Sequence, residues 1–331
     1  MKWFHGLSTI LCVMPASAAL EWFETTQTPV LQQYTANIPI RIVTHNIRYA
    51  TSTPFKGEEL WSKRKSQLVN ELKFNTRYNL ESFICLQEVL HIQLNDILSG
   101  LNQDFASIGP SREAEWAYIG VGRDNGKAKG EYSPIFYRPS IWKLRHWETV
   151  WLSKTPSRPS RSWDASNNRI VTIGVFQHVA TGKSVIALNT HLDDQGSKSR
   201  FHAAHIILNK IYEYLNGVDK ERISGVFLAG DLNSSEDQEA YLVLTSPSSP
   251  LYDAQKANSL ESHYGNELTY TGFGYENEPQ TRIDYVMLGQ SEAEADHIPW
   301  KVYGYAVLAN KFDDGVFSSD HRAVVVDTLL R

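Results

Sequence analysis

The sequence predicts an α/β fold in which two mixed β-sheets pack against each other and helices lie outside them. Two observations support this prediction. Predicted strands outnumber predicted helices along the 331 residues. The strands are also connected in two ways, because one pair is joined by a tight turn and others are separated by amphipathic helices. Tight turns give antiparallel pairs and helical crossovers give parallel pairs, so the predicted sheets are mixed.

Four elements are predicted in the N-terminal part of the chain. Residues 41–44 predict a strand, because the run is rich in β-branched side chains. Residues 61–78 carry apolar side chains at helical spacing and predict a helix. Residues 83–86 are wholly apolar and predict a short buried strand, and a helical pattern follows over residues 90–101.

The C-terminal part begins with the predicted hairpin. Residues 170–178 and 185–188 have strand character and are joined by the turn at 180–183. Residues 200–215 follow as an amphipathic helix. The remaining predicted strands, in chain order, are residues 226–229, 283–288, 303–308 and 323–329.

Composition and charge describe an ordinary globular chain. Hydrophobic residues make up 42% of the sequence and charged residues 21%, so a sizeable core can form. The 32 basic and 37 acidic side chains give a net charge of −5, which provides no general attraction for nucleic acid or anionic membranes. Any phosphate-bearing partner must therefore be held by a local site. Because no repeat or linker divides the chain, we predict a single domain over residues 19–331.

The first 18 residues have the pattern of a signal peptide. Lys2 precedes the apolar run at residues 7–13, and Ala16-Ser17-Ala18 is a small-x-small cleavage pattern. We therefore expect a secreted protein, with a buried N-terminal helix as the alternative. No later stretch reaches the roughly 20 apolar residues that a transmembrane helix needs. Removal of the leader would leave Cys85 as the sole cysteine, so we expect no intramolecular disulfide.

Polar residues recur where the apolar strands end or begin. They are Asn46, Glu88, His191, Asp231, Asn233, Asp284, Asp320 and His321. Because strand ends can project several side chains into one cleft, we expect these residues to converge on one site. Glu88, Asp320 and Asn46 offer the hard oxygen ligands that Mg²⁺ prefers. Taken singly, each residue also has a structural explanation, such as a turn residue or a helix cap, so the prediction depends on their joint order.

That order resembles the endonuclease/exonuclease/phosphatase superfamily of metal-dependent phosphohydrolases. The matching strings are Thr44-His45-Asn46, Leu86-Gln87-Glu88-Val89, Asn189-Thr190-His191-Leu192, Gly230-Asp231-Leu232-Asn233, Arg282-Ile283-Asp284-Tyr285 and Ser319-Asp320-His321. They span nearly the whole predicted domain. A closer likeness, to secreted or hypothetical bacterial and fungal members, is carried by Ser133-Pro134-Ile135-Phe136-Tyr137-Arg138, Trp163-Asp164-Ala165 and Asp193-Asp194-Gln195-Gly196. The resemblance implies a four-layer α/β sandwich, with two central mixed β-sheets flanked by helices and the site at one edge.

The resemblance also implies a metal site and a group of catalytic residues. Glu88 would bind Mg²⁺ or Mn²⁺, with Asn46 and Asp320 as direct or water-bridged ligands. The implied catalytic residues are His321 as general base or phosphate contact, Asp284 as the partner that fixes its tautomer, Asp231 on the attacking water, Asn233 positioning water and phosphate, and His191 donating to a phosphate oxygen.

Two further residues are predicted to contact the substrate. Arg169 opens a strand and could bind a phosphate, although an arginine in that position is also typical of a solvated surface. Asn189 lies in the same motif as His191. Asn233 is the first residue of the sequence Asn233-Ser234-Ser235, which is an N-glycosylation sequon. Glycan on Asn233 would contradict its place in an active site.

These observations predict a secreted, divalent-metal-dependent phosphoester hydrolase that uses a metal-activated water. We expect a phosphodiester rather than a monoester, and a small or lipid-linked substrate rather than a long nucleic acid, because the chain is acidic. We also expect a monomer. One alternative is a secreted nuclease acting on DNA or RNA. Another is a non-catalytic binding module on the same fold, which the intact set of polar residues disfavours.

Overall fold

The computed structural model describes residues 37–106, 114–217, 223–257, 260–275, 279–290 and 299–331. The chain divides into two compact units, Met1–Tyr34 and Thr35–Arg331, and all described residues belong to the second. The predicted signal peptide at residues 1–18 lies outside the described residues and stays a prediction. None of the described helices is long and apolar enough to cross a membrane.

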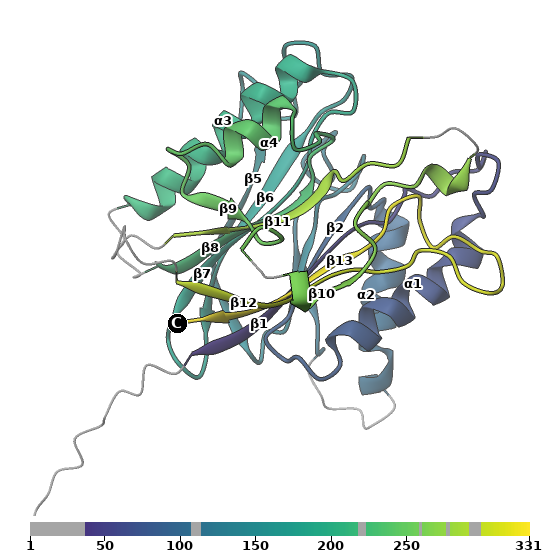
Figure 1. Cartoon of the computed structure of the whole chain (residues 1–331), viewed down its shortest axis with the longest axis horizontal. Helices are drawn as coiled ribbons and strands as arrows, with labels where there is room; N and C mark the ends of the chain where they lie inside the picture. The colour runs from purple at the N-terminus through teal and green to yellow at the C-terminus, as the bar shows by residue number, and fades with distance from the viewer. Residues whose placement is uncertain (1–36, 107–113, 218–222, 258–259, 276–278, 291–298) are drawn as a thin grey trace, which may run out of the picture. The chain divides into compact units, whose positions relative to one another are not determined.

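The described residues form two mixed β-sheets (Figure 1). The seven-stranded sheet has the order β10 (His263–Gly265), β12 (Trp300–Val307), β13 (Val324–Leu330), β1 (Ile38–Asn46), β2 (Phe83–Gln87), β4 (Ile135–Tyr137) and β3 (Ala117–Ile119). The six-stranded sheet has the order β5 (Trp142–Trp151), β6 (Ile170–His178), β7 (Ser184–His191), β8 (Ile223–Asp231), β11 (Asp284–Gly289) and β9 (Leu251–Asp253).

Both sheets combine parallel and antiparallel pairs, which confirms the predicted fold class. β6 and β7 form the predicted antiparallel hairpin, and β7 then pairs in parallel with β8 across the helical crossover. In the other sheet β1 is parallel to β2 and antiparallel to β13. The first and last strands of the described fold are thus neighbours, so residues near both ends of the sequence lie side by side.

Helices cover the outer face of each sheet (Figure 1). α1 (Trp61–Thr76) and α2 (His91–Ala106) pack on the seven-stranded sheet. α3 (Ser197–Leu215) and α4 (Glu239–Leu244) pack on the six-stranded sheet. Two short 3₁₀ helices, η1 (Leu260–Ser262) and η2 (Gly272–Gly274), complete the described helical segments.

The side chains of the central strands explain the four layers. In β2, Phe83 and Cys85 point into the core between the sheets, whereas Ile84 and Leu86 contact the α1 and α2 layer. Successive side chains of a strand alternate between its two faces, so a strand covered on both faces is apolar throughout. This is why the predicted strands appear in the sequence as continuous apolar runs.

Sequence patterns did not predict every element. β5 escaped detection because seven of its ten residues are exposed or only partly buried without a regular alternation, as is possible for a strand at a sheet edge. The three-residue strands β3, β4, β9 and β10 and the short helix α4 also had no clear pattern. These elements gain their regular structure from neighbours that are distant in sequence.

Strand register places the predicted site residues at one edge of the two sheets. The parallel pairs align Asn46 with Gln87 and His191 with Asp231. Asp284 begins β11 directly opposite Asp231. Because β13 is antiparallel to β1, the residues that precede β13 reach the same edge. The edge therefore collects polar groups from both sheets.

Candidate active site

A cavity of about 640 Å³ opens at this edge. Seven of the ten predicted site residues line it, namely Glu88, Arg169, His191, Asp231, Asn233, Asp320 and His321. Asn46 and Asp284 lie behind that lining and hydrogen-bond to members of it. Asn189 is elsewhere in the core. The eight strand-end residues therefore converge on one cavity, and of the two predicted substrate contacts Arg169 joins them.

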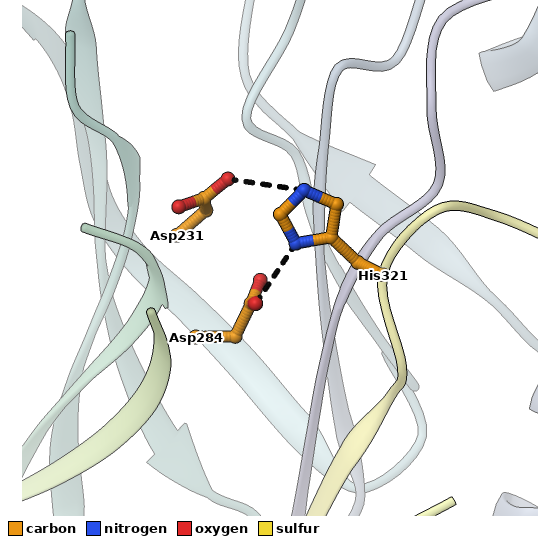
Figure 2. A group of neighbouring side chains, drawn as sticks. All are labelled: Asp231, Asp284 and His321. Atoms are coloured by element: carbon orange, nitrogen blue, oxygen red, sulfur yellow. Dashed lines mark hydrogen bonds and ion pairs between the residues drawn. The ribbon is translucent and has the colours of Figure 1, made fainter. Parts of the chain in front are cut away.

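His321 lies between two carboxylates, one at each ring nitrogen (Figure 2). Its Nδ1 is 2.9 Å from Asp284 Oδ2, and its Nε2 is 3.8 Å from Asp231 Oδ2. Burial alone would lower the pKa of His321, but the two carboxylates outweigh it and raise the pKa to about 10. The imidazole is therefore protonated near neutral pH in this arrangement.

Asp231 is hydrogen-bonded on both sides of the site, to Asn46 at the end of β1 in one sheet and to Asn233 just after β8 of the other. Its Oδ2 accepts a hydrogen bond of 2.9 Å from Asn46 Nδ2, and its Oδ1 accepts one of 2.8 Å from the backbone of Asn233. Burial, followed by the charge of Asp284, raises the pKa of Asp231 to about 7. A carboxylate with a pKa near neutrality can accept a proton during a reaction and release it afterwards.

Glu88 lines the cavity, and Asn46 behind it connects Glu88 to Asp231. Glu88 has a left-handed φ of 59°, which turns its side chain out of the end of β2. Its Oε1 accepts a hydrogen bond of 3.1 Å from Asn46 Nδ2, and its Oε2 accepts one of 3.1 Å from the backbone of Tyr49. Arg48 Nη1 lies 3.8 Å from the same Oε2. Asn46 Oδ1 accepts the backbone N–H of Arg48, so the amide nitrogen of Asn46 faces the carboxylates.

Two groups of side chains could hold a divalent ion. Asp231, Asp284 and His321 offer ligand atoms within 4.8 Å of one another. In that group the raised pKa of His321 leaves a proton on both ring nitrogens near neutral pH, so neither lone pair is available to a metal. Glu88 and Asp320 are a better fit, because both line the cavity with oxygen atoms, and burial together with the charge of Glu88 raises the pKa of Asp320. A hard cation between these carboxylates would relieve their repulsion.

His191 is bound by Asn233 at the cavity floor. Asn233 Nδ2 donates to His191 Nε2 at 3.0 Å and to the backbone oxygen of Leu192 at 3.0 Å. Burial, with the charges of Arg169 and Arg123, keeps the pKa of His191 well below its ordinary value, so the ring is neutral. Because Nε2 accepts, the ring hydrogen lies on Nδ1, and this is the nitrogen through which His191 can donate.

The same contacts bear on the glycosylation sequon. Both hydrogens of Asn233 Nδ2 are used in hydrogen bonds, and the residue has a left-handed φ of 45°. A glycan attached to this nitrogen would have to break at least one of these bonds. The local geometry therefore disfavours a glycan at this position.

The two predicted substrate contacts lie in different places. Arg169 precedes β6, lines the cavity and forms ion pairs with Asp193 and Asp194. Asn189 is fully buried and holds the two sheets together instead of facing the cavity. It accepts from Gln87 Nε2 at 2.8 Å and donates to the backbone oxygens of Leu86 and Pro134, both at 2.8 Å. This structural position replaces the predicted substrate contact.

Sequence patterns missed a second ion pair in the cavity lining. Arg123 lies in a glycine-rich segment that resembled a surface loop, yet its side chain is largely buried and binds Glu131 through two contacts of 2.7 Å. Burial, followed by the nearby charge of Glu88, raises the pKa of Glu131 to about 7. In the sequence, Arg123 and Glu131 are simply two opposite charges eight residues apart. Because such spacings are common on protein surfaces, the spacing alone did not predict a buried ion pair.

Comparisons with known proteins identify the family. The structure resembles an endonuclease/exonuclease/phosphatase from Bacteroides vulgatus with a TM-score of 0.73 and 30% sequence identity, over 88% of this chain and 99% of the other. The chain belongs to the endonuclease/exonuclease/phosphatase family. Another similar member is a mannosyl-6-phosphatase from Bacteroides thetaiotaomicron VPI-5482, with a TM-score of 0.72 and 26% identity over 87% of this chain and 99% of that one.

A curated relative lies further away in sequence. The Ccr4 subunit, a 3'-5'-exoribonuclease of the CCR4-Not complex from Debaryomyces hansenii, is 20% identical over 256 residues. The match covers 72% of this chain and 30% of the length of that relative. No family model matches the sequence. Members of the endonuclease/exonuclease/phosphatase family thus include both phosphatases and nucleases, and the chain has the hydrolase fold of this family.

Proposed function

We propose that this member of the endonuclease/exonuclease/phosphatase family is a divalent-metal-dependent phosphoester hydrolase. The observation that carries the proposal is one cavity that combines the partly buried carboxylates Glu88 and Asp320 with the group formed by Asp231, His321 and Asp284. The first pair suits Mg²⁺ or Mn²⁺, and the second group can move a proton. Both are needed for attack of water on a phosphorus atom.

The roles of the side chains follow from their contacts. Asp231 accepts a proton from the attacking water, because its carboxylate has a pKa near neutrality and faces the cavity. The protonated ring of His321 places positive charge next to the phosphate, and Asp284 holds that ring in position. Asn46 orients the Glu88 and Asp231 carboxylates through its amide nitrogen. A bound divalent ion would polarise the phosphate and stabilise the leaving oxygen.

The proposed reaction balances without a covalent enzyme intermediate. The oxygen of water forms a bond to phosphorus, and the bond between phosphorus and the alcohol oxygen breaks. The proton that Asp231 removes from the attacking water passes to solvent, and the leaving alkoxide takes a proton from a water molecule, so it is released as an alcohol. His191 and Asn233 line the same cavity, and the hydrogen bond between them fixes the orientation of the His191 ring.

The test compares four substrates with the purified full chain. Bis-p-nitrophenyl phosphate, p-nitrophenyl phosphate, DNA and RNA are incubated with Mg²⁺ or Mn²⁺ and with EDTA. We expect metal-dependent hydrolysis that a His321→Ala variant loses. Equal turnover by that variant, or no metal-dependent turnover of any phosphoester, would overturn the proposal. The ratio between the two aryl esters tests the predicted preference for diesters, and cleavage of DNA or RNA would support the nuclease alternative.

We also propose that the protein is secreted after cleavage behind Ala18. The support is the sequence pattern of the leader, in which Lys2 precedes an apolar run at residues 7–13 and the small-x-small pattern Ala16-Ser17-Ala18. Mass spectrometry of protein from the culture medium should find Ala19 at the N-terminus and no glycan on Asn233. Retention of residues 1–18 in medium-derived protein would contradict the proposal.

A further inference from the structure

We propose that the alcohol part of the substrate is a small polyhydroxylated group, such as a sugar. It would bind to four side chains of the cavity, which we call the hydroxyl-binding wall: Asn167, Arg169, Asp194 and Gln195. This inference rests on the proposed phosphoester hydrolysis and names the class of alcohol that is released. The wall lies in the same cavity as Glu88, so one molecule can reach both.

The wall is fixed before any ligand binds. Asp193 accepts hydrogen bonds from the backbone nitrogens of Ser166, Asn167, Gln195 and Gly196 at 2.8 to 3.2 Å. Asp193 thereby joins the segment before β6 to the segment after β7. Asp164 accepts two further backbone hydrogen bonds at the first turn of α3. A wall that is already ordered loses little conformational freedom when it binds a ligand.

The wall offers a donor beside an acceptor. Arg169 Nη2 donates to Asp194 Oδ1 at 2.6 Å, and Gln195 Nε2 donates to Asp194 Oδ2 at 2.8 Å. The Asp194 side chain remains 44% exposed, so its oxygens can accept more hydrogen bonds. Arg169 Nη1 is buried and has no hydrogen-bond partner in the part of the chain that the structure describes. A hydroxyl group both donates and accepts, which matches this pair.

The charges of the cavity disfavour a second phosphate. Three arginines line it, and each already pairs with carboxylates. Arg48 contacts Glu58 at 3.0 Å, Arg123 contacts Glu131 at 2.7 Å, and Arg169 contacts both Asp193 and Asp194. Among the described lining residues, no cation is left unpaired for a second anion. A polynucleotide backbone would bring such anions, whereas a neutral polyol would not.

The aromatic side chains of the cavity also disfavour a nucleobase at the wall. Tyr49 and Tyr270 are the aromatic residues of the described lining, apart from the histidines. The backbone of Tyr49 binds Glu88, and the Tyr270 ring lies 5.1 Å from that of His321. Both therefore belong to the reacting end of the cavity. Bases are usually held by stacking on aromatic side chains, and the wall provides none.

The test uses matched pairs of substrates and an Asp194→Ala variant. The substrates are glucose 6-phosphate, mannose 6-phosphate, their 2-deoxy, 3-deoxy and 4-deoxy analogues and p-nitrophenyl phosphate, each offered both as the monoester and as its methyl diester, because the proposed function expects a diester. We expect at least one hexose phosphate to exceed p-nitrophenyl phosphate in kcat/KM with the unaltered chain. In the variant, the ratio of these two kcat/KM values should fall by at least about tenfold, mainly through KM.

Deoxy analogues test the contact itself. Removal of the hydroxyl that Asp194 binds should lower kcat/KM of the unaltered chain by about tenfold but change that of Asp194→Ala by less than about twofold. Asp313→Asn is the matched control, because Asp313 is an exposed carboxylate outside the cavity lining. The control should keep the original ratio. If Asp194→Ala does not fold, the Asp194→Asn variant and the deoxy series with the unaltered chain give the same information.

The possible failures are distinguishable. An unchanged ratio in both Asp194 variants, or deoxy analogues that are all as good as their parents, would overturn the inference about the alcohol. Much faster hydrolysis of a dinucleotide than of every sugar phosphate would also overturn it. In each of these cases, metal-dependent p-nitrophenyl phosphate hydrolysis that His321→Ala loses would leave the proposed function standing.

Discussion

The two sides of the cavity differ in their balance of charge. The side that we call the reaction wall consists of Glu88, Asp231, Asp320 and His321, with Asp284 behind them. Its carboxylates outnumber the cations in contact with them, and the pKa values of Asp231 and Asp320 are raised. In the hydroxyl-binding wall, Arg169 forms ion pairs with Asp194 and with Asp193 beside the wall, and its Nη1 has no hydrogen-bond partner among the described residues. Excess negative charge suits a metal ion, whereas a balanced pair suits a neutral polar ligand.

Chelation should have the largest effect on turnover, because it would remove the metal ion that the reaction wall is proposed to hold. We expect EDTA to reduce turnover to the uncatalysed background and added Mg²⁺ or Mn²⁺ to restore it. Titration calorimetry should show weaker Mn²⁺ binding by Glu88→Gln than by the unaltered chain. Full activity after chelation and gel filtration into metal-free buffer would contradict the assignment of this wall.

Replacement of His321 by alanine should have the next largest effect. Loss of the protonated ring between Asp231 and Asp284 should lower kcat by about 10² to 10⁴. His205→Ala is the matched control, because His205 is an exposed histidine on α3 outside the cavity lining, and it should stay within about twofold of the unaltered chain. Similar kcat values for the two variants would show that His321 has no role in the reaction.

Replacement of Asn189 should affect stability rather than substrate binding. Asn189→Ala leaves Gln87 and two buried backbone oxygens without their partner, so the free energy of unfolding should fall by about 3 kcal/mol. Urea unfolding measures this change, and KM at a temperature where the variant is folded should be unaltered. A raised KM without loss of stability would restore the substrate contact that the sequence predicted.

Replacement of Asp193 should cause a somewhat smaller loss that depends on pH. Burial alone would raise the pKa of Asp193, but hydrogen bonds and Arg169 outweigh it and lower the pKa from 3.8 to about 2. Because the pKa of Asp193 is lower in the folded state than in the unfolded state, the charged carboxylate stabilises the fold at pH values above the ordinary pKa of 3.8. This contribution is lost as the pH falls towards the folded-state pKa of about 2. At neutral pH, Asp193→Asn should therefore lose about 2 kcal/mol of unfolding free energy.

The pH profile of that variant separates charge from packing. The difference in urea midpoint between Asp193→Asn and the unaltered chain should be constant from pH 7 to pH 5. It should shrink below pH 4, with about half of it gone near pH 3. A difference that stays constant down to pH 3 would mean that the Asp193 charge does not hold the hydroxyl-binding wall in place.

The strand-end residues show how far sequence patterns predicted this protein. The apolar runs before Asn46, Glu88, His191 and Asp231 marked buried strands, and the motif order indicated the family and one common site. Patterns failed for β5, whose exposed residues obscure its strand character, and for the Arg123–Glu131 pair. Both depend on neighbours whose identity the local sequence does not contain.

The sequence by itself determined the core strands, the kinds of polar residue at their ends and therefore the chemistry that the site can offer. Only the tertiary structure decided which of these groups face the cavity. Asn189 and His191 are two residues apart, yet one binds the sheets together and the other lines the cavity. Likewise, packing pairs Arg169 with Asp193 and Asp194 across 24 and 25 positions of the chain. A local pattern fixes the face to which a side chain points, but the partner that it meets there is fixed by which strands pair and by how the two sheets pack.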